Sequence, residues 1–508
     1  MTDVTMQPWD AHNQELIAHV HPSDWQNPEP RDRYHLVVLG AGTGGLVTAA
    51  IAAGLGAKVA LVEKHLMGGD CLNVGCVPSK GVISAARAWH GARSAAERFG
   101  GPAVDGDGDF AAVMERMRRL RAGIAPIDGA RRFRDELGID VFLGHGRFIA
   151  GDTLEVDGAR LRLRRAVVAT GGRAVLPPIP GLDGVDVLTN ESIFSLTERP
   201  QRLGVIGGGP IGCELAQAFS RLGSSVTLVD RGPHVLHRED SDAAAIVQEA
   251  LARDGIDLLL GATIHGVEAA EEGGGTTLCI GRGRDISTPT VDALLVAAGR
   301  APNVADLGLE AAGVDFDPKT GITVDARLRT TNSRIFAVGD VASRYQFTHT
   351  ADAQARMVVR NAFFFGRGRS SDLVIPWCTY TSPEIAHVGR YAADAERAGH
   401  QVDTITVPFD DVDRAILDGE TEGFLRIHLE RGTDRILGGT LVAERAGDMI
   451  GPLALAITHG LGLSKFSSTI FPYPTQGEVF RKAGDRYNRT RLTDGARRFF
   501  ELWFKIFS

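Results

Sequence analysis

Two glycine-rich runs, each between a short apolar strand and a helix of small residues, constrain the fold of this chain more than any other feature. The first run, residues 40–45, follows the apolar segment 35–39 and precedes a predicted helix over 46–55. A second predicted strand, 58–62, leads into Glu63. A strand, a glycine loop, a helix, a strand and an acid in this order are typical of a dinucleotide-binding unit. The sequence therefore predicts a bound nucleotide cofactor in this region.

Each glycine of the first run has its own predicted role. Gly40 allows a tight turn, Gly42 lets the backbone approach a pyrophosphate, and Gly45 lets the helix pack closely on the strand. The N-terminus of the helix then faces the negative charge of the phosphates. Glu63 is expected to accept hydrogen bonds from a ribose.

The same arrangement occurs again further along the chain. A predicted strand at 202–206 leads into a second glycine run, a predicted helix and a strand that ends at Asp230. The glycines of this run are Gly207, Gly209 and Gly212. One such pattern alone is weak, but two complete units predict two bound dinucleotides.

The end of the second unit bears on the choice of nicotinamide cofactor. The carboxylate of Asp230 is expected to accept from a ribose 2'-hydroxyl and to repel a 2'-phosphate, which favours NADH. Arg231 follows directly and could pair with that phosphate, which favours NADPH. Charge favours NADH slightly, and NADPH stays open as the alternative.

Two cysteines, Cys71 and Cys76, lie shortly after the first unit in a glycine-rich stretch that is predicted to open a helix. The chain has 5 cysteines, too few for a fold held together by disulfides. A flavin takes a hydride from a nicotinamide on one face and passes two electrons to a disulfide on the other. We therefore predict FAD in the first unit and a redox-active Cys71/Cys76 pair beside it; the alternative is a non-redox pair in a loop. Cys213, Cys279 and Cys378 lie in apolar or strand contexts and are predicted to be buried packing residues.

The two thiols are expected to have different roles. Cys76 is predicted to contact the flavin as a thiolate, stabilised by the N-terminus of its helix. Cys71 is predicted to be the exposed thiol that exchanges with the substrate. Lys80 lies one helical turn after Cys76, where it could pair with Glu214 beneath the flavin ring.

Length and charge exclude several other classes of protein. With 508 residues the chain is too long for one hydrophobic core and is predicted to form several domains. Its formal net charge of -8 gives no overall attraction to nucleic acid, so no nucleic-acid partner is expected. It has no run of about 18 uncharged apolar residues and no apolar segment near its start that resembles a secretion signal. A cytoplasmic location is therefore expected.

The two ends of the chain fall outside these units. Residues 1–33 show no helical or strand periodicity and are predicted to lie on the surface as an N-terminal extension. Histidines at 12, 19 and 21 lack partners with metal-ligand spacing, so no metal site is predicted. Residues 491–508 form an aromatic tail. We favour its packing on the dimer over the alternative of contact with a membrane surface.

Seven stretches of this chain match a known set of motifs: 40–45, 69–80, 169–171, 207–214, 298–300, 336–340 and 381–384. Together they resemble the class I pyridine nucleotide-disulfide oxidoreductases, the flavoenzyme family of glutathione reductase, dihydrolipoyl dehydrogenase and mercuric reductase. The resemblance implies an α/β fold with two Rossmann-like dinucleotide-binding domains, for FAD and NAD(P)H, and a C-terminal α/β dimerisation domain. It also implies a homodimer whose active site takes residues from both subunits.

The resemblance also implies domain boundaries and further site residues. The expected domains are an extension over 1–33, an FAD-binding domain over 34–184 and 301–371, an NAD(P)H-binding domain over 185–300, an interface domain over 372–490 and the tail over 491–508. Residues implied to contact FAD are Gly69, Thr170, Gly171, Gly339 and Asp340. Gly299 is implied to contact NAD(P)H.

The chain departs from its disulfide-reducing relatives in the C-terminal motif. Those enzymes have a histidine before Pro-Thr, followed by a glutamate, and this pair moves the proton of the exchanging thiol. Here Tyr473 takes the place of the histidine, while Glu478 is present. A phenol, with a reference pKa of about 10, is a poor base at neutral pH. Tyrosine at this position resembles mercuric reductase, yet no cysteine follows Cys378, so the C-terminal cysteine pair of mercuric reductase is missing.

The sequence therefore predicts a mercuric reductase-like FAD enzyme that oxidises NAD(P)H and reduces a small electrophile at Cys71/Cys76. The substrate is expected to be a thiophilic metal ion or a disulfide, with Tyr473 and Glu478 of the second subunit lining the site. Two alternatives stay open. One is a flavin oxidoreductase that passes electrons to quinones or oxygen, and the other is a redox sensor without turnover.

Overall fold

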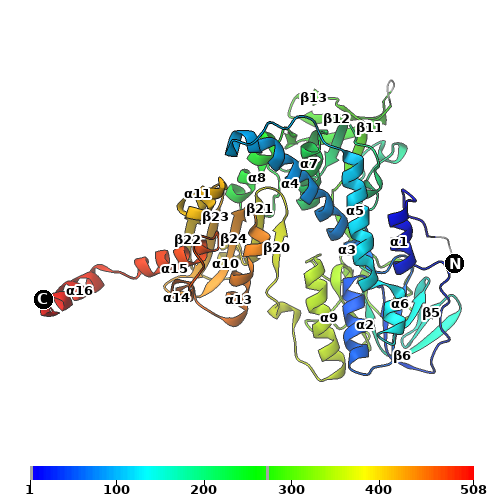
Figure 1. Cartoon of the computed structure of the whole chain (residues 1–508). Coiled ribbons are helices and arrows are strands. Elements are labelled where there is room, and N and C mark those ends of the chain that lie inside the picture. The colour runs from blue at the N-terminus through cyan, green and yellow to red at the C-terminus, as the bar shows by residue number, and fades with distance from the viewer. Residues whose placement is uncertain (1–3, 271–273, 508) are drawn as a thin grey trace. The chain divides into compact units, whose positions relative to one another are not determined.

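The computed structural model describes residues 4–270 and 274–507, which divide into two compact units (Figure 1). The first unit comprises residues up to 95, 102–231 and 256–373, and the second comprises 96–101, 232–255 and 374 onward. Both units combine helices with sheets, so the predicted α/β fold class is confirmed.

The first unit contains a seven-stranded sheet that includes the first glycine-loop unit. The strands are β1 (Tyr34–Leu39), β2 (Val59–Glu63), β3 (Asp140–Leu143), β4 (Gly146–Ala150), β5 (Thr153–Val156), β6 (Ala159–Val168) and β19 (Ile335–Ala337). Parallel pairing joins β3, β2, β1, β6 and β19, while β5 and β4 continue antiparallel from β6. Strand β19, far along the chain from β6, thus lies beside it in the same sheet.

Two helices from distant parts of the sequence pack together in this unit. Helix α2 (Thr43–Gly54) follows the first glycine run, and α9 (Thr348–Phe363) follows β19. They lie side by side (Figure 1). The small residues of α2, mostly alanine and glycine, permit this close approach.

A second parallel sheet in the same unit has the strand order β10-β9-β8-β15. Its strands are β8 (Arg202–Ile206), β9 (Ser225–Asp230), β10 (Asp257–Leu260) and β15 (Ala293–Val296), and helix α7 (Pro210–Arg221) joins β8 to β9. An antiparallel sheet of β11 (Thr263–Ala269), β12 (Thr276–Arg282), β13 (Asp285–Ser287) and β14 (Thr290–Val291) lies between β10 and β15 in the sequence. Two short pairs complete the strands of this unit: β7 (Gly172–Ala174) with β16 (Arg300–Pro302), and β17 (Phe316–Asp317) with β18 (Gly321–Ile322).

The second unit contains an antiparallel sheet with the strand order β20-β21-β24-β23-β22. Its strands are β20 (Pro376–Thr379), β21 (Glu384–Gly389), β22 (Val402–Pro408), β23 (Phe424–Glu430) and β24 (Ile436–Ala443). Strand β21, in the interior of this sheet, was not predicted from the sequence. Most of β21 is buried, so its sequence lacks the polar–apolar alternation that indicates a strand with one exposed face.

The remaining helices vary in length. They are α1 (Ala11–Val20), α3 (Gly69–Asn73), α4 (Cys76–Phe99), α5 (Phe110–Ile124), α6 (Ala130–Asp135), α8 (Ser241–Arg253), α10 (Ala392–Arg397), α11 (Asp413–Asp418), α12 (Ala446–Met449), α13 (Gly451–His459), α14 (Ser464–Ser468), α15 (Glu478–Thr490) and α16 (Asp494–Phe507). Short 3-10 helices lie at Ala125–Asp128, Leu182–Gly184, Ile193–Ser195, Gly339–Val341, Ser370–Asp372 and Phe409–Asp411. Helix α5, one 3-10 turn and α6 follow one another closely between Phe110 and Asp135.

The N-terminal segment is more ordered than the sequence analysis predicted. Residues Ala11–Val20 form helix α1, whose first turn is capped by the side chain of Asp10. Leu16 and Val20 are fully buried. The expectation of an irregular surface extension is therefore wrong for this part. Only one narrow stripe of α1 is apolar, which makes the helical period hard to see in so short a segment.

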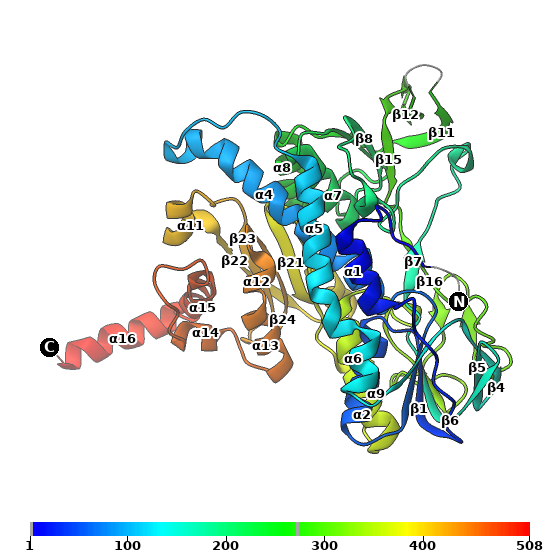
Figure 2. The same ribbon diagram turned by 45° about the vertical axis from the view of Figure 1, so that its right-hand side comes forward.

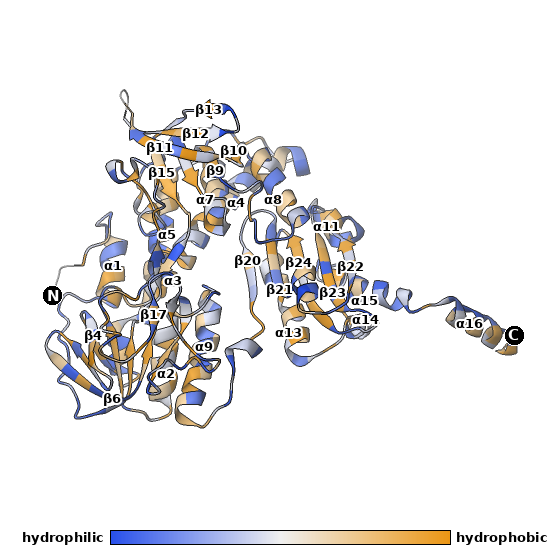
Figure 3. Cartoon of the chain, turned by 180° about the vertical axis from the view of Figure 1, so that it is seen from behind, coloured by the Kyte–Doolittle hydropathy of each residue, from blue (hydrophilic) through white to orange (hydrophobic). Residues whose placement is uncertain are grey.

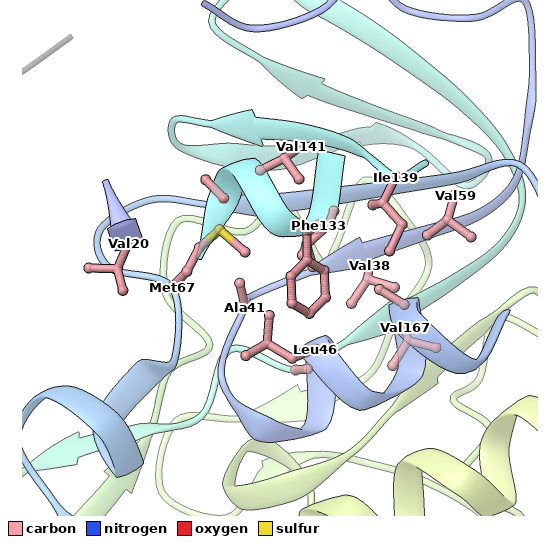
Figure 4. Packing of buried hydrophobic residues seen from close by; sticks show 14 of the residues in the cluster. Val20, Val38, Ala41, Leu46, Val59, Met67, Phe133, Ile139, Val141 and Val167 are labelled. Atoms are coloured by element: carbon pink, nitrogen blue, oxygen red, sulfur yellow. The ribbon is translucent and has the colours of Figure 1, made fainter. Parts of the chain in front are cut away.

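This buried stripe joins a large hydrophobic core in the first unit. The core contains side chains of α1, β1, β2 and α2. Figure 4 shows Val20 beside Met67, and Phe133 close to Val38 and Leu46. Views from two directions also place α1 beside α5 (Figures 1 and 2). The start of the chain is thus part of the structure that supports the first glycine loop.

The aromatic tail forms helix α16, and none of its side chains is buried. It carries both hydrophobic and hydrophilic residues along its length (Figure 3). Packing on the dimer and contact with a membrane surface both stay predictions for this helix. Within residues 4–270 and 274–507, no helix is long and apolar enough to cross a membrane.

The three cysteines predicted to be packing residues differ in burial. Cys213 is fully buried in α7, as expected. Cys279 and Cys378 are only partly buried, so that prediction is wrong for them. Cys378 nevertheless packs against the hydrophobic core of the second unit.

Leu16→Ala tests whether the N-terminal segment is part of the core. Because Leu16 is fully buried among apolar side chains, the variant should lose about 2–5 kcal/mol in the free energy of unfolding of the first unit. Urea denaturation of the full chain measures this loss. Glu15→Ala, on the exposed face of the same helix, should change it by less than about 0.5 kcal/mol. Equal stability of the two variants would contradict the packing of α1.

Candidate active site

The two glycine runs adopt the same local geometry. Gly40 and Gly207 have φ angles of +99° and +112°, and a Cβ atom added to them would lie 2.4 and 2.6 Å from a carbonyl oxygen of the neighbouring strand end. A Cβ added to Gly45 or Gly212 would lie 1.8 or 1.9 Å from the carbonyl oxygen of the first glycine of its own run. At these positions a larger residue would force the helix off the strand.

The middle glycine of each run faces open space instead. A Cβ added to Gly209 would meet no atom within 4 Å, and one added to Gly42 would meet only Gly69, at 3.7 Å. Gly42 and Gly209 are the residues before the first turns of α2 and α7, where free backbone amides point outward. Both loops therefore fit a dinucleotide pyrophosphate, which would be held by these amides.

The acid that follows each second strand braces its glycine loop. Glu63 accepts hydrogen bonds from the backbone amides of Ala41, at 2.7 Å, and His65, at 2.8 Å. Asp230 accepts one from the amide of Gly208, at 2.6 Å. Each carboxylate is thus placed at its loop, where its remaining lone pairs fit the hydroxyls of a ribose. The side chain of Arg231, beside Asp230, is exposed.

The two cysteines of the predicted redox pair lie on two consecutive helices. Cys71 is in the short helix α3, and Cys76 is the first residue of α4. Gly75 permits the tight turn between them, because a Cβ there would lie 2.8 Å from the carbonyl oxygen of Asp70. Both thiols are at least partly accessible, and the contact predicted for each of them stays a prediction.

The electrostatics of the pair favour one thiolate and one thiol. The pKa of Cys76 is lowered to about 6, mainly by a hydrogen bond from Cys71. Burial of Cys76 acts in the opposite direction and raises its pKa, but by less. A hydroxyl of Thr348 and the charge of Lys80 lower it further. Conversely, the hydrogen bond to Cys76 and burial raise the pKa of Cys71. The surroundings therefore favour the thiolate at Cys76 over Cys71. The contact of Cys76 with the flavin stays a prediction.

Lys80 and Glu214 form the ion pair that the sequence analysis expected. Lys80 Nζ lies 2.8 Å from Glu214 Oε2, which joins α4 to α7. The Glu214 side chain is 8% exposed, so the pair is well shielded on that side. The cation is fixed one helical turn from Cys76, where it stabilises the thiolate.

Thr348 is a site residue that the sequence analysis missed. Its Oγ1 lies 3.4 Å from Cys76 Sγ, and it is the first residue of α9. The thiolate of Cys76 therefore lies at the N-termini of two helices, α4 and α9, both of which favour negative charge. A threonine at the start of a predicted helix was the available signal, but nothing in the sequence places it beside residue 76.

Arg300 and its two carboxylate partners were also missed as a group. The Arg300 guanidinium contacts Asp70, lies 3.6 Å from Asp340, and donates to the Gly172 carbonyl oxygen at 3.0 Å. Burial raises the pKa of Asp340 to about 6, although Arg300 opposes this shift. Asp340 was predicted as an FAD contact, and Arg300 links it to the turn that carries Cys71.

The other predicted cofactor residues lie at strand ends of the first unit, except Gly69, which begins helix α3. Thr170 Oγ1 donates to the Asn303 carbonyl oxygen at 2.7 Å, which fixes the chain just after β6. Gly171, Gly299 and Gly339 all have positive φ angles. A Cβ on Gly171 or Gly299 would meet no atom within 4 Å, so the backbone there is open to a ligand. Gly69, also at positive φ, packs against Gly42.

Tyr473 and Glu478 lie in the second unit. The Tyr473 hydroxyl donates to Asp413 Oδ2 at 3.0 Å, and this bond raises the pKa of the exposed phenol. Glu478 is nearly buried at the start of α15 and contacts Arg481. Their placement opposite the cysteines of a second subunit stays a prediction.

The family of the chain follows from comparison with known proteins. Residues 34–355 match the pyridine nucleotide-disulphide oxidoreductase family, and residues 375–484 match its dimerisation domain. The chain belongs to the pyridine nucleotide-disulphide oxidoreductases, and the predicted membership is confirmed. Its members use FAD and NAD(P)H, and the dimerisation domain supports a homodimer.

Individual relatives cover nearly the whole chain. Mercuric reductase of Bacillus cereus is 34% identical over 495 residues, spanning 95% of this chain and 76% of that protein. Dihydrolipoyl dehydrogenase of Thermus scotoductus is 34% identical over 464 residues, spanning 90% of this chain and 98% of that protein. Among solved structures, the Cu(II) complex of the HOCl-induced flavoprotein disulfide reductase RclA from Escherichia coli has a TM-score of 0.78 at 29% identity, covering 88% of this chain and 98% of that one. LpdA from Mycobacterium tuberculosis has a TM-score of 0.80 at 27% identity, covering 89% and 99%.

Thr348→Val tests the origin of the low pKa of Cys76. Loss of the hydroxyl that donates to the thiolate should raise this pKa from about 6 by about one unit. The ultraviolet thiolate absorbance of the reduced protein, recorded against pH with Cys76→Ser as the blank, measures the shift. Thr350→Val is the matched control, because its buried hydroxyl in α9 has no hydrogen-bond partner among the described residues. An unchanged midpoint in Thr348→Val would show that this contact does not stabilise the thiolate.

Proposed function

We propose that this enzyme uses NAD(P)H to reduce a thiophilic metal ion, such as Hg(II), at the Cys71/Cys76 pair. The observation that carries the proposal is a dithiol with a preformed thiolate at Cys76, combined with a tyrosine in place of the catalytic histidine. FAD, when bound, would carry two electrons from the nicotinamide to this pair. In the overall reaction one NAD(P)H and one divalent ion give NAD(P)⁺, the metal and one proton.

The chemistry of the pair suits a soft metal ion. Thiolates are preferred ligands of soft cations, and two sulfurs on adjacent turns can bind one ion together. A cation that binds the pair displaces the remaining thiol proton, because it stabilises the thiolate of Cys71 as well. Glu214 holds the ammonium group of Lys80 in an ion pair, so that this cation does not compete freely with a metal ion for the sulfurs. Several relatives are mercuric reductases, and one solved neighbour is a Cu(II) complex.

Reduction of a disulfide substrate is the second candidate. It is favoured by similarity to dihydrolipoyl dehydrogenase and to a flavoprotein disulfide reductase. Disulfide exchange needs a group that accepts and returns the proton of the exchanging thiol. Tyr473 is poorly suited to this task, because its hydroxyl already donates to Asp413 and its pKa is raised by that bond. We therefore rank the metal ion first.

For the electron donor we propose NADH over NADPH. The carboxylate of Asp230 lies at the second glycine loop, where its charge would repel a 2'-phosphate. The exposed guanidinium of Arg231 could offset this repulsion, so both coenzymes belong in any assay.

Cys71→Ser tests the dithiol mechanism. Loss of one sulfur should lower Hg(II)-dependent oxidation of NADH and NADPH by about 100-fold or more, since the pair acts as a unit. The flavin spectrum should show FAD still bound. Cys279→Ser, a partly buried strand cysteine outside the site, should retain activity and serves as the control. Turnover in Cys71→Ser equal to that of the wild type would exclude the dithiol route.

Tyr473→His tests whether the missing base separates this enzyme from disulfide reductases. Because a positioned general base contributes about 100-fold or more, the variant should gain activity of that order on glutathione disulfide or lipoamide. Tyr473→Phe removes the hydroxyl without adding a base and should gain nothing. If the wild type already reduces these disulfides as fast as the histidine variant, the second candidate replaces the first.

A further inference from the structure

The N-terminal segment contacts the stretch of chain that carries the dithiol. The backbone amide of Met67 donates to the Val20 carbonyl oxygen at 3.2 Å, and the His21 ring contacts the carbonyl oxygen of His65. Leu16 and Leu72 belong to the same hydrophobic core. Residues 65–72, which lead into and through α3, are thus held by the start of the chain.

A buried arginine extends this contact to the turn between the two cysteines. Arg121 is 2% exposed and reaches in two directions from α5. Its Nη1 donates to the Asn73 carbonyl oxygen at 2.5 Å, and its Nη2 donates to Asn13 Oδ1 at 2.7 Å. Asn73 is the last residue of α3 and lies between Cys71 and Cys76. Arg121 therefore bridges α1 to the dithiol turn.

Both ends of this bridge are fixed by further hydrogen bonds. Asn13 is fully buried, and its amide nitrogen donates to the Pro8 carbonyl oxygen at 2.8 Å. Asp10, the cap of α1, pairs with Arg118 at 2.5 Å. At the other end, the Asn73 side chain donates to the carbonyl oxygens of Met67 and Gly69 at 3.0 and 2.9 Å. The turn has little freedom to move while these bonds hold.

Because Arg121 is charged and buried, it depends on its two hydrogen-bond acceptors, Asn73 and Asn13. Burial lowers the pKa of Arg121 to about 10, which leaves it protonated at neutral pH. Its Nε has no hydrogen-bond partner among the described residues, so the two bridging bonds are its main compensation. Loss of either acceptor would leave a buried guanidinium partly unpaired and would loosen the turn.

We propose that residues 10–21 form a strap that positions the dithiol, and that Asn13 and Arg121 are positioning residues for Cys71 and Cys76. By holding the turn rigid, the strap keeps the two sulfurs close and raises their effective concentration toward each other. A loosened turn lowers that concentration and favours the dithiol over the disulfide. The inference rests on the redox role of the pair in the proposed function.

Asn13→Ala tests the strap. The holoenzyme is equilibrated with buffers of reduced and oxidised glutathione, and the fraction of Cys71/Cys76 disulfide is counted by thiol labelling and mass spectrometry. The variant should shift the equilibrium constant toward the dithiol by about three-fold or more. Gln14→Ala, its exposed neighbour on α1, should show no shift. Asn13→Asp keeps an acceptor for Arg121 and should stay near the wild-type value.

Two variants decide whether the strap acts on the dithiol. A wild-type equilibrium in folded, FAD-bound Asn13→Ala would overturn the proposal. If that variant does not fold, Asp10→Ala replaces it, because Asp10 is only partly buried and its loss frees the cap of α1 and Arg118. It should shift the equilibrium in the same direction, and no shift would overturn the proposal.

The glutathione assay also separates this proposal from the proposed function. It contains neither a metal ion nor NAD(P)H, so failure of the wild type to reduce Hg(II) would refute the metal substrate and leave the strap supported. A wild-type pair that forms no disulfide in any buffer would remove the redox role on which both proposals rest.

Discussion

The negative charge on Cys76 is the feature on which the rest of the site depends. A bare thiolate in a partly closed site is unfavourable unless donors and cations surround it. Here Cys71 and Thr348 donate to it, and Lys80 supplies a fixed cation held by Glu214. These groups come from α3, α4, α7 and α9. The sheets of the first unit serve to bring those four helices together at one sulfur atom.

The two glycine loops have the same steric requirements. In each, the first and last glycines are placed so that a Cβ would collide with a carbonyl oxygen, while the middle glycine is open. In each, the acid after the second strand accepts a hydrogen bond from a backbone amide of the loop. The same arrangement thus creates two anion sites at helix N-termini. It explains how a single chain holds one nucleotide that delivers electrons and another that receives them.

The groups around the dithiol and the residues of the C-terminal motif belong to different units of the chain. The thiolate, its donors and both nucleotide loops lie in the first unit. Tyr473, Asp413 and Glu478 lie in the second unit, which carries the dimerisation domain of the family. In the proposed function, tyrosine instead of histidine at residue 473 alters the acceptor and leaves the path from NAD(P)H to the sulfurs unchanged.

The sequence by itself determined the family, the two nucleotide units and the dithiol, because local spacing is enough to define a strand–loop–helix turn and a cysteine pair on adjacent turns. It also placed Lys80 opposite Glu214. It did not predict Thr348, Arg300 or Arg121 as neighbours of the dithiol, and it missed α1 and β21. Those features depend on contacts between residues far apart in the chain and on burial of both faces of an element, neither of which leaves a periodic pattern. Only the tertiary structure shows which groups stabilise the thiolate predicted for Cys76, because the donors that lower its pKa come together only when the chain is folded.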